Sequence, residues 1–561
     1  MKLAAVFSDG MVLQRDKEIY IFGESDTSEA IDIEIDDIRV SSVVKPGKWY
    51  ITLPAHAAGG PYEMVIRAVT EPGNVNGADK CIIIRDILYG EVWLDNGQSN
   101  IEFEIQNSVG GAEELKKADY PEIRYFKAIK APVIDDDFLR EEEKLRWHKC
   151  SNGDFSEMSG IGYFFAQKLQ KNLKIPVGIV DCYWGGTSIT CWLEKENLVS
   201  ETEGKEYFEE YERAIEGKTK EQYQSEVEAY NEELAEYQRL ALEVTEKNPD
   251  ITPGELRKAA GEYPWPPPMG AESAFRPCGL IETMMKRVAP YTVRGIIYYQ
   301  GEEDAVKNYE DIRDKSKLDV FFYEGFYRKL LRRLISQYRS LFRDEALPIV
   351  LVQLPMFIAE GDEDLRKWGY LREAQAEVSR ELASVMMVPL IDLGEYDNIH
   401  PVDKKTPGER IAGEVLGQIY GDTSAGVRHM NIGSAYRIKG GVTLRFNDTY
   451  GGIALGKNDL MDIRRECTYS DDGLIFGLEI GIENEVTAEN DAEKESCITW
   501  KVPERAVIDD GRLVIYEKKH IAAVRYAFFD YGKVNLYNRR SAPLAPFRIK
   551  VAGEESCADG K

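Results

Sequence analysis

Five short apolar runs that alternate with helical sequence constrain the fold of this 561-residue chain most strongly. The runs are Ile87–Leu94, Val177–Tyr183, Arg294–Tyr299, Pro348–Leu354 and Val385–Leu390. Runs of this length and composition are typical of strands buried on both faces of a parallel sheet. Helical patterns lie between them at Gly160–Asn172, Val320–Leu341 and Tyr370–Leu382. The alternation predicts an α/β domain with a mainly parallel sheet over residues 89–428.

The sequence on either side of this domain has a different pattern. Residues 1–88 consist of short strand-like segments separated by Gly, Pro, Asp or Asn, which predicts a small β-sandwich. Residues 429–552 predict a second β domain, and residues 553–561 a disordered tail.

The α/β domain itself is interrupted at about residues 200–265. This segment is rich in Glu, Lys and Gln and predicts long solvated helices, which the Pro-rich segment Tyr263–Met269 follows. The insertion is either a lid or substrate wall, or a packing surface that could support a homo-oligomer.

Charge and cysteine content exclude several classes of partner. The net charge of −27, from 71 Lys and Arg against 98 Asp and Glu, repels phosphate backbones, so we expect no nucleic-acid partner. The eight cysteines form no C-x-x-C pair or Cys/His cluster, so neither a metal nor another cofactor is expected. No apolar stretch has the length of a membrane helix, and the first residues do not form a signal-peptide pattern. We therefore predict a cytoplasmic protein without a membrane partner.

Polar or glycine-rich turns follow four of the predicted strands. They are Gly97–Asn100, Trp184–Thr187, Tyr299–Glu302 and Asp397–Pro401. Ligands bind beyond the carboxyl ends of the strands in open α/β sheets, so we expect these turns to meet at one edge.

The residue types in these turns are those of nucleophilic catalysis. Ser99 lies on a tight turn, and His400 is the one histidine of five that follows an α/β strand beside a carboxylate. A serine nucleophile needs such a base, and Asp397 would fix the imidazole tautomer. The Ser99 N–H, the Gly186 N–H and the Gln300 side chain are candidate donors to an oxyanion.

The chain resembles the sialate O-acetylesterase family of SGNH-type hydrolases, whose members deacetylate carbohydrates. The matching segments run along most of the chain and include Phe7–Arg15, Ala57–Tyr62, Gly90–Leu94, Gly97–Asn100, Trp184–Thr187, Tyr299–Glu302, Gln353–Pro355, Leu371–Gln375, Ile399–Pro401, Asn535–Asn538 and Pro546–Arg548. The resemblance implies a flavodoxin-like three-layer α/β domain and a carbohydrate O-acetylesterase that works through an acyl-enzyme.

The resemblance also implies roles for individual residues. Ser99 would be the nucleophile and His400 the general base, and the oxyanion hole would use the Ser99 N–H, the Gly186 N–H and the Gln300 side chain. Supporting or substrate-binding roles fall to Gln98, Asn100, Trp184 and Glu302. The family often has an acid two residues before the histidine, where this chain has Asn398, so we predict Asp397 as the third triad member. A Ser–His pair whose histidine is held by a backbone carbonyl is the alternative.

Two other functions compete with the esterase. One is a carbohydrate-binding scaffold with a degenerate hydrolase core, and the other is a glycoside hydrolase using Glu302, Glu303 and Asp397 as opposed carboxylates. The sugar itself is either an O-acetylated sialic acid or a neutral acetylated xylo- or manno-oligosaccharide. The acidic charge of the chain favours the neutral sugar.

Overall fold

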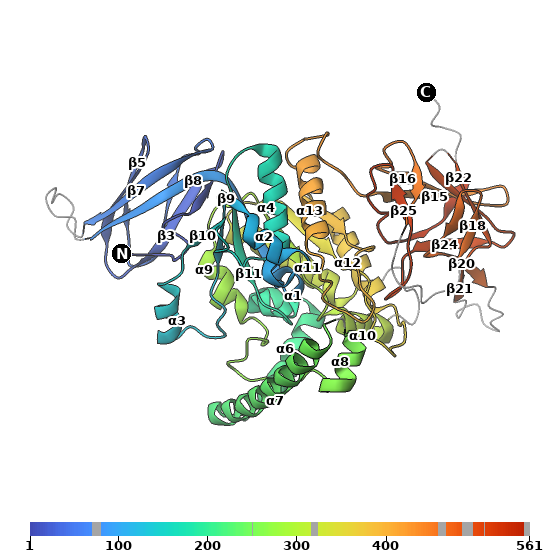
Figure 1. Cartoon of the computed structure of the whole chain (residues 1–561), viewed down its shortest axis with the longest axis horizontal. Coiled ribbons are helices and arrows are strands. Elements are labelled where there is room, and N and C mark those ends of the chain that lie inside the picture. Colours follow the sequence, from blue (N-terminus) through green and yellow to red (C-terminus); the bar gives the residue numbers. More distant parts are fainter. Residues whose placement is uncertain are drawn as a thin grey trace.

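The computed structural model describes residues 1–69, 80–249, 251–315, 324–457, 467–484, 497–509 and 511–554. Figure 1 shows three parts in a row: an N-terminal β domain in blue, a central α/β domain, and a C-terminal β domain in red. Helices α6, α7 and α8 project from the central part. Among the described residues, no helix combines the length and apolar character needed to cross a membrane.

The central sheet confirms the predicted α/β domain with mainly parallel strands. Its order is β10 (Trp147–Ser151), β9 (Asp119–Lys127), β11 (Val177–Tyr183), β8 (Lys80–Gly97), β12 (Gly295–Tyr299), β13 (Ile349–Gln353) and β14 (Val385–Pro389). All neighbours along this order pair in parallel except β10 and β9, which pair antiparallel. The sequence did not predict β10 or β9.

Two adjacent residues of β8 show that helices cover both faces of the sheet. A Cβ added at Gly162 of α4 (Gly160–Leu173) would lie 2.3 Å from Asp95 Oδ2. The neighbouring Asn96 Oδ1 accepts a 2.8 Å hydrogen bond from Tyr338 of α11 (Phe326–Leu341). Successive side chains of a strand point to opposite faces, so α4 and α11 lie on opposite sides of the sheet. With α13 (Lys405–Gln418) packed on α4 and α12 (Lys367–Glu381) on α11, the domain has three layers.

Strand β8 also connects the N-terminal domain to the central sheet. Its first half pairs antiparallel with β7 (Gly59–Val69), and its second half pairs in parallel with β11 and β12. The predicted domain boundary at residue 88 therefore lies inside one continuous strand. The remaining N-terminal strands are β1 (Lys2–Leu3), β2 (Val12–Gln14), β3 (Ile19–Ser25), β4 (Glu29–Ile35), β5 (Ile38–Val44) and β6 (Gly47–Leu53). One hydrophobic core runs through both domains.

The insertion forms the predicted helices, α6 (Thr202–Ile215), α7 (Lys220–Lys247) and α8 (Pro253–Ala260). Helix α7 begins at a capping box of Thr219 and Gln222, and none of its residues is buried. We call residues 263–269 the strap. It runs back beside α7, because Tyr230 donates a 3.1 Å hydrogen bond to the Pro264 carbonyl. Lys218 holds its far end through the Met269 carbonyl at 2.9 Å.

The shorter helices complete the α/β domain. They are α1 (Ser99–Glu102), η1 (Ile105–Asn107), α2 (Gly111–Lys117), α3 (Asp136–Glu142), η2 (Ile189–Trp192), α5 (Lys195–Val199), η3 (Ile281–Met285), α9 (Lys286–Val288) and α10 (Ala305–Lys315). The predicted helix Val320–Leu341 corresponds to α11, and its residues 320–323 lie outside the described ranges.

The C-terminal domain contains two larger sheets that share a second hydrophobic core. Its strands are β15 (Asn431–Ile438), β16 (Gly441–Asn447), β17 (Ile453–Leu455), β18 (Thr468–Ser470), β19 (Gly473–Ile475), β20 (Leu478–Asn484), β21 (Cys497–Lys501), β22 (Arg505–Asp509), β23 (Arg512–Tyr516), β24 (Ile521–Tyr526), β25 (Leu536–Asn538), β26 (Phe547–Lys550) and β27 (Ala552–Glu554). Since β27 pairs with β15, residues 553 and 554 belong to a sheet rather than to the predicted tail. Residues 555–561 of that tail lie outside the described ranges.

Candidate active site

Ser99 lies at the carboxyl edge of the central sheet, where the turns after β8, β11 and β12 meet. The register pairs Gly97, the last residue of β8, with Tyr183 of β11 and with Tyr299 of β12. Gly97 has a φ of +142°, and a Cβ there would lie 1.9 Å from the Tyr299 carbonyl oxygen. Only glycine fits this turn, which brings Ser99 to the first position of α1.

His400 is in hydrogen-bond contact with Ser99, as the sequence predicts. Its Nε2 lies 2.8 Å from Ser99 Oγ, although 301 positions separate the two residues. Burial, and then the nearby Lys404 charge, lower the pKa of His400 to about 4. The imidazole is therefore neutral near pH 7 and can accept the serine proton at Nε2.

Asp397 does not reach His400, although both residues are described. The backbone of Asp397 is left-handed, with a φ of +58°. Its Oδ1 accepts hydrogen bonds from Arg257 Nη2 at 2.6 Å and from the Glu360 N–H at 2.7 Å. Asp397 thus links the histidine loop to α8 of the insertion, and no hydrogen bond joins it to the imidazole. Its role as triad acid stays a prediction.

Asn398 and Glu395 hold the histidine loop from within. Asn398 Oδ1 accepts a 3.0 Å hydrogen bond from the His400 backbone N–H. Glu395 accepts from Asn398 Nδ2 at 2.7 Å and from the Val402 N–H at 2.9 Å. Asn398, at the family's usual acid position, and Glu395 together stabilise the backbone on both sides of His400.

Two backbone N–H groups are available at this edge. Gly185 lies beside the serine, since a Cβ added there would lie 3.3 Å from Ser99 Cβ. Its N–H donates to Glu102 Oε2 at 2.5 Å, which fixes the turn that continues into Gly186. Within the described ranges, neither the Ser99 N–H nor the Gly186 N–H donates to another protein group. Both groups are therefore available to an oxyanion, and their role as oxyanion donors stays a prediction.

The predicted third donor, Gln300, is committed to the protein. Its fully buried Nε2 donates to Asp304 Oδ2 at 2.6 Å, and to Gln98 Oε1 and the Thr187 carbonyl at 3.1 Å each. Three acceptors thus compete for the two hydrogens of this amide. Gln300 therefore connects the turns after β8, β11 and β12. We call Gln300 and its partners Gln98 and Asp304 the brace.

Gln98 and Asp304 complete this brace. Gln98 Oε1 also accepts from the Gly301 and Glu303 N–H groups, each at 3.3 Å. Asp304 accepts from Ser188 Oγ at 2.6 Å and from the Ile189 N–H at 2.8 Å. Asp304 escaped sequence analysis because nothing in its local pattern indicates that it reaches across to the turn after β11.

A second buried network lies behind the Ser–His pair. Asn100 Nδ2 donates to Glu302 Oε1 at 2.6 Å and to the Ile399 carbonyl at 3.0 Å, next to the histidine. Lys404, only 2% exposed, donates to Asn100 Oδ1 at 2.8 Å. Burial raises the pKa of Glu302 to about 7 and lowers that of Lys404 to about 7. Glu302 and Asn100 thus lie in one buried network beside the Ser–His pair. Lys404, four residues after His400, belongs to no motif that the sequence analysis recognised.

Trp184 is half-buried at the same edge. The Nζ atom of Lys130 lies 5.2 Å from the centroid of its ring, and Lys130 is also paired with Glu102. The structure thus places all the predicted site residues around Ser99, except that Asp397 turns toward Arg257.

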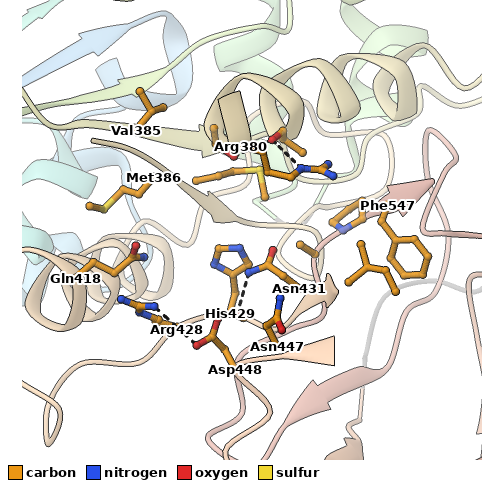
Figure 2. A pocket seen from close by; sticks show the side chains of 16 residues that line it. Arg380, Val385, Met386, Gln418, Arg428, His429, Asn431, Asn447, Asp448 and Phe547 are labelled. Carbon is orange, nitrogen blue, oxygen red and sulfur yellow. Dashed lines mark hydrogen bonds and ion pairs between the residues drawn. The ribbon is translucent and has the colours of Figure 1, made fainter. Parts of the chain in front are cut away.

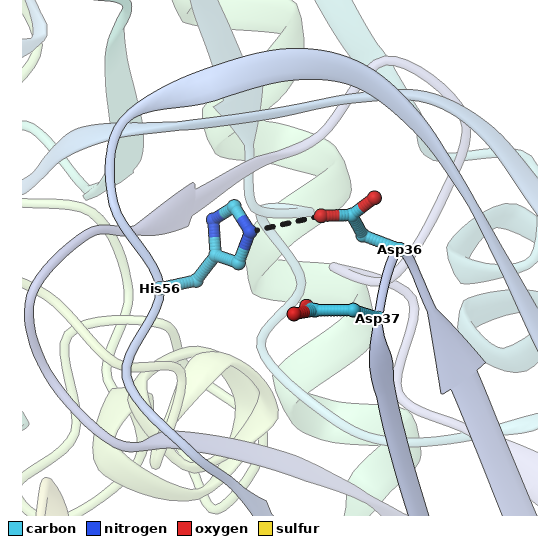
Figure 3. Close-up of side chains that lie close together, drawn as sticks. All are labelled: Asp36, Asp37 and His56. Atoms are coloured by element: carbon cyan, nitrogen blue, oxygen red, sulfur yellow. Dashed lines mark hydrogen bonds and ion pairs between the residues drawn. The ribbon is translucent and has the colours of Figure 1, made fainter.

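Two other features lie away from these residues. Figure 2 shows a pocket between the α12–β14 region and the C-terminal domain, where His429 and Arg380 are among the lining residues. Figure 3 shows Asp36, Asp37 and His56 in the N-terminal domain, whose potential ligand atoms all lie within 4.8 Å of one another. Asp36 and Asp37 are exposed, and His56 is half-buried. None of the three takes part in the Ser99 site.

A neutral histidine bonded to a serine, beside free backbone N–H groups at the edge of a parallel sheet, is the arrangement that serine hydrolases use.

Comparison with known proteins gives a more specific result. Residues 279–420, which include Gln300, Glu302 and His400, match the family described as carbohydrate esterase, sialic acid-specific acetylesterase. The sialate O-acetylesterase of Mus musculus is 24% identical over 445 residues, which cover 73% of this chain and 72% of that protein. The Homo sapiens protein of that name is 26% identical over 213 residues, 35% of this chain and 39% of the relative.

A solved structure of a carbohydrate esterase has a similar fold over nearly the whole chain. The crystal structure of a carbohydrate acetylesterase from Xanthomonas citri matches with a TM-score of 0.66 and 23% identity, over 98% of this chain and 99% of that one. The family match and the mammalian relatives confirm the resemblance to the sialate O-acetylesterase family that the motifs predict.

Proposed function

We propose that this chain is a carbohydrate O-acetylesterase in which Ser99 is the nucleophile and His400 the general base. The observation that carries the proposal is the 2.8 Å contact between Ser99 Oγ and the neutral His400 imidazole. The sialate O-acetylesterase relatives support the same activity. The three-layer domain agrees with an SGNH-type fold, and the flanking domains with β-sandwiches. The cytoplasmic location stays a prediction.

The reaction follows from the positions of these groups. Ser99 Oγ attacks the acetyl carbonyl carbon while His400 Nε2 takes its proton. The oxyanion that forms accepts hydrogen bonds from the Ser99 and Gly186 N–H groups. The bond between the acetyl carbon and the sugar oxygen then breaks as His400 gives the proton to that oxygen, which leaves as a hydroxyl, and an acetyl ester remains on Ser99. A water molecule, deprotonated by His400, hydrolyses this ester and releases acetate.

The braces act by holding these groups still. Gln300 and Asp304 fix the turn that carries Gly186 relative to the turn that carries Ser99. Asn100 connects the serine turn to the Ile399 carbonyl and so to the histidine loop. Positioning errors of about 1 Å can cost roughly 100-fold in rate, so these buried contacts matter for activity.

The carboxylates do not favour a glycoside hydrolase. That reaction needs two carboxyl groups facing one sugar. Here Glu302 is buried on Asn100, and Asp397 is paired with Arg257. A degenerate binding scaffold is equally disfavoured, because the nucleophile, the base and two oxyanion donors are all present.

The test is acetate release from acetylated xylo-oligosaccharide and from O-acetylated sialic acid by wild type and Ser99→Ala. The variant should lose at least ~1000-fold in rate and keep its melting temperature, because the Ser99 side chain bonds only His400 among the described residues. Ser200→Ala, an exposed serine of the same domain, is the matched control and should keep full activity. Near-normal release by Ser99→Ala would refute the assignment.

A further inference from the structure

The strap brings an exposed tryptophan to the turn that lines the serine. A Cβ added at Gly186 would lie 2.3 Å from Trp265 Cη2, so the edge of the indole contacts the Gly186 backbone. Gly185, the next residue in the turn, lies beside Ser99. Trp265 therefore reaches the acyl-binding edge of the site from the insertion, a segment that contributes nothing to the parallel sheet.

The indole is held in place and yet remains accessible. Trp265 is 43% exposed, and Phe275 packs perpendicular to it with ring centroids 5.4 Å apart. The hydrogen bonds from Tyr230 and Lys218 fix the strap at both ends. A large aromatic side chain costs little entropy to order and offers an apolar face with a polar N–H at its rim. These properties complement a pyranose ring, which has an apolar C–H face and hydroxyl groups at its edge.

The charges around the site indicate which sugars fit. Lys130 is paired with Glu102, and Arg257 with Asp397 at 2.6 Å. Lys404 is buried against Asn100. In the described ranges, each cation that contacts the site residues therefore already has a partner in the protein. Glu303, in the turn bound by Gln98, adds no cation, and burial raises the pKa of its carboxyl to about 8. A sugar carboxylate would meet no free cation here and would be repelled by a chain of net charge −27.

We propose that Trp265 is the platform on which a neutral, acetylated pyranoside stacks while its acetyl group reaches Ser99. This inference rests on the proposed function and extends it to the substrate class and to a role for the insertion. The strap then forms a wall of the substrate site, and Trp265 is a specificity-determining residue rather than part of the acyl-transfer chemistry.

The experiment compares wild type, Trp265→Ala and Trp265→Phe on two acetyl esters. One is acetylated xylo-oligosaccharide, and the other is ethyl acetate, which has no ring to stack. Trp265→Ala should lower kcat/KM on the oligosaccharide by roughly 10- to 50-fold, mainly through KM, and leave ethyl acetate within ~2-fold. Trp265→Phe should retain part of the oligosaccharide activity, because a smaller ring face remains.

The control is Tyr263→Ala, which removes another exposed aromatic of the strap. Tyr263 packs on Tyr237 of α7 with ring centroids 5.4 Å apart. Its substitution should change kcat/KM on neither substrate by more than ~2-fold. An equal loss on both esters in Trp265→Ala would overturn the proposal, because it would mean that the indole only props the Gly186 turn. An unchanged oligosaccharide rate would overturn it as well. A higher kcat/KM for O-acetylated sialic acid than for the neutral oligosaccharide would refute the substrate class.

Binding without catalysis separates this inference from the proposed function. Unacetylated xylo-oligosaccharide is titrated by calorimetry into Ser99→Ala and into Ser99→Ala/Trp265→Ala. At least ~10-fold weaker binding by the double variant supports the platform even if wild type releases no acetate, in which case only the esterase proposal fails. Equal binding by the two proteins, or none by either, refutes the platform.

Discussion

The two sides of the Ser99 site are built in different ways. On the sheet side, three strand-end turns are locked together by the buried side chains of Gln98, Gln300 and Asp304. On the other side, the loop of His400 is tied to the insertion by the Arg257–Asp397 ion pair, and the exposed strap closes the edge. In the proposed function, the acyl-transfer groups are therefore held by the rigid sheet edge, whereas the proposed sugar platform lies on an inserted segment with little buried surface.

The largest expected effect comes from His400, which reaches the framework from the loop side. His400→Ala removes the base and should lower kcat by about 100- to 10,000-fold. The melting temperature should barely change, because the half-buried imidazole has only Ser99 Oγ as its hydrogen-bond partner among the described residues. Acetate-release kinetics and thermal denaturation measure the two quantities. His520→Ala, at an exposed histidine of the C-terminal domain, should behave as wild type.

Gln300→Ala tests whether the sheet side is a braced framework. The substitution leaves the carbonyl of Thr187 and the buried side-chain oxygens of Gln98 and Asp304 without this donor. We expect the free energy of unfolding to fall by about 2–4 kcal/mol, because stranded buried polar groups are costly. Chemical denaturation of the variant and of the exposed control Gln418→Ala gives the difference. A lower kcat with an unchanged denaturation midpoint would instead identify Gln300 as an oxyanion donor.

The framework also contains a buried acidic pair that should make the sheet side sensitive to pH. Asp95 of β8 and Asp181 of β11 are register partners, and both oxygens of Asp95 are buried without a hydrogen bond of good geometry to any described residue. Burial, and then the neighbouring carboxylate, raise the pKa of Asp95 well above its usual value. A raised carboxyl pKa contributes stability below the unfolded value near pH 4, and that contribution is lost as the pH rises through the folded value.

Asp95→Asn removes the ionisable group, so the variant does not lose stability when the pH rises, and the side chain keeps its shape. The variant should be more stable than wild type at about pH 8, by roughly 1–3 kcal/mol, and similar to it at about pH 4. Melting temperatures at the two pH values test this expectation, with the exposed Asp137→Asn as control. Equal destabilisation of the variant at both pH values would contradict the claim that ionisation of Asp95 lowers the stability of the wild type.

The smallest effect is expected from Asp397→Asn on the insertion side. In a triad, the corresponding change costs about 10,000-fold in kcat. Here Asp397 bonds Arg257 and the Glu360 N–H, so the rate should fall by less than ~10-fold, mainly through a looser histidine loop. Arg257→Gln, which breaks the same ion pair, should give a similar loss in the same kinetic assay. A thousandfold fall in Asp397→Asn alone would show that the carboxylate turns to His400 during the reaction.

Local patterns predicted the sheet side well. The run Val177–Tyr183 has the same bounds as β11, and the glycine-rich turns after the strands converge because parallel strands share a carboxyl edge. Ser99 and His400 could be paired from sequence, because few histidines follow an α/β strand.

The remaining features depend on contacts that no local pattern encodes. Strand β9 was missed because Arg124 within it is charged, yet it is buried through hydrogen bonds to the Gly10 and Asp86 carbonyls and an ion pair with Asp86. The spacing of Asp397 and His400 suggested a triad, but the left-handed backbone at Asp397 turns the carboxylate toward α8. The contact of Trp265 with Gly186 joins an insertion to a turn 79 positions away in the sequence.

Covalent labelling tests the central claim, that Ser99 is activated by His400, most directly. A fluorophosphonate that reacts with activated serines is added to wild type and to His400→Ala, and peptide mapping locates the label. The account predicts one phosphonylated residue, Ser99, loss of acetate release in proportion to labelling, and little labelling of His400→Ala. A label on another serine, or full acetate release by labelled enzyme, would contradict it.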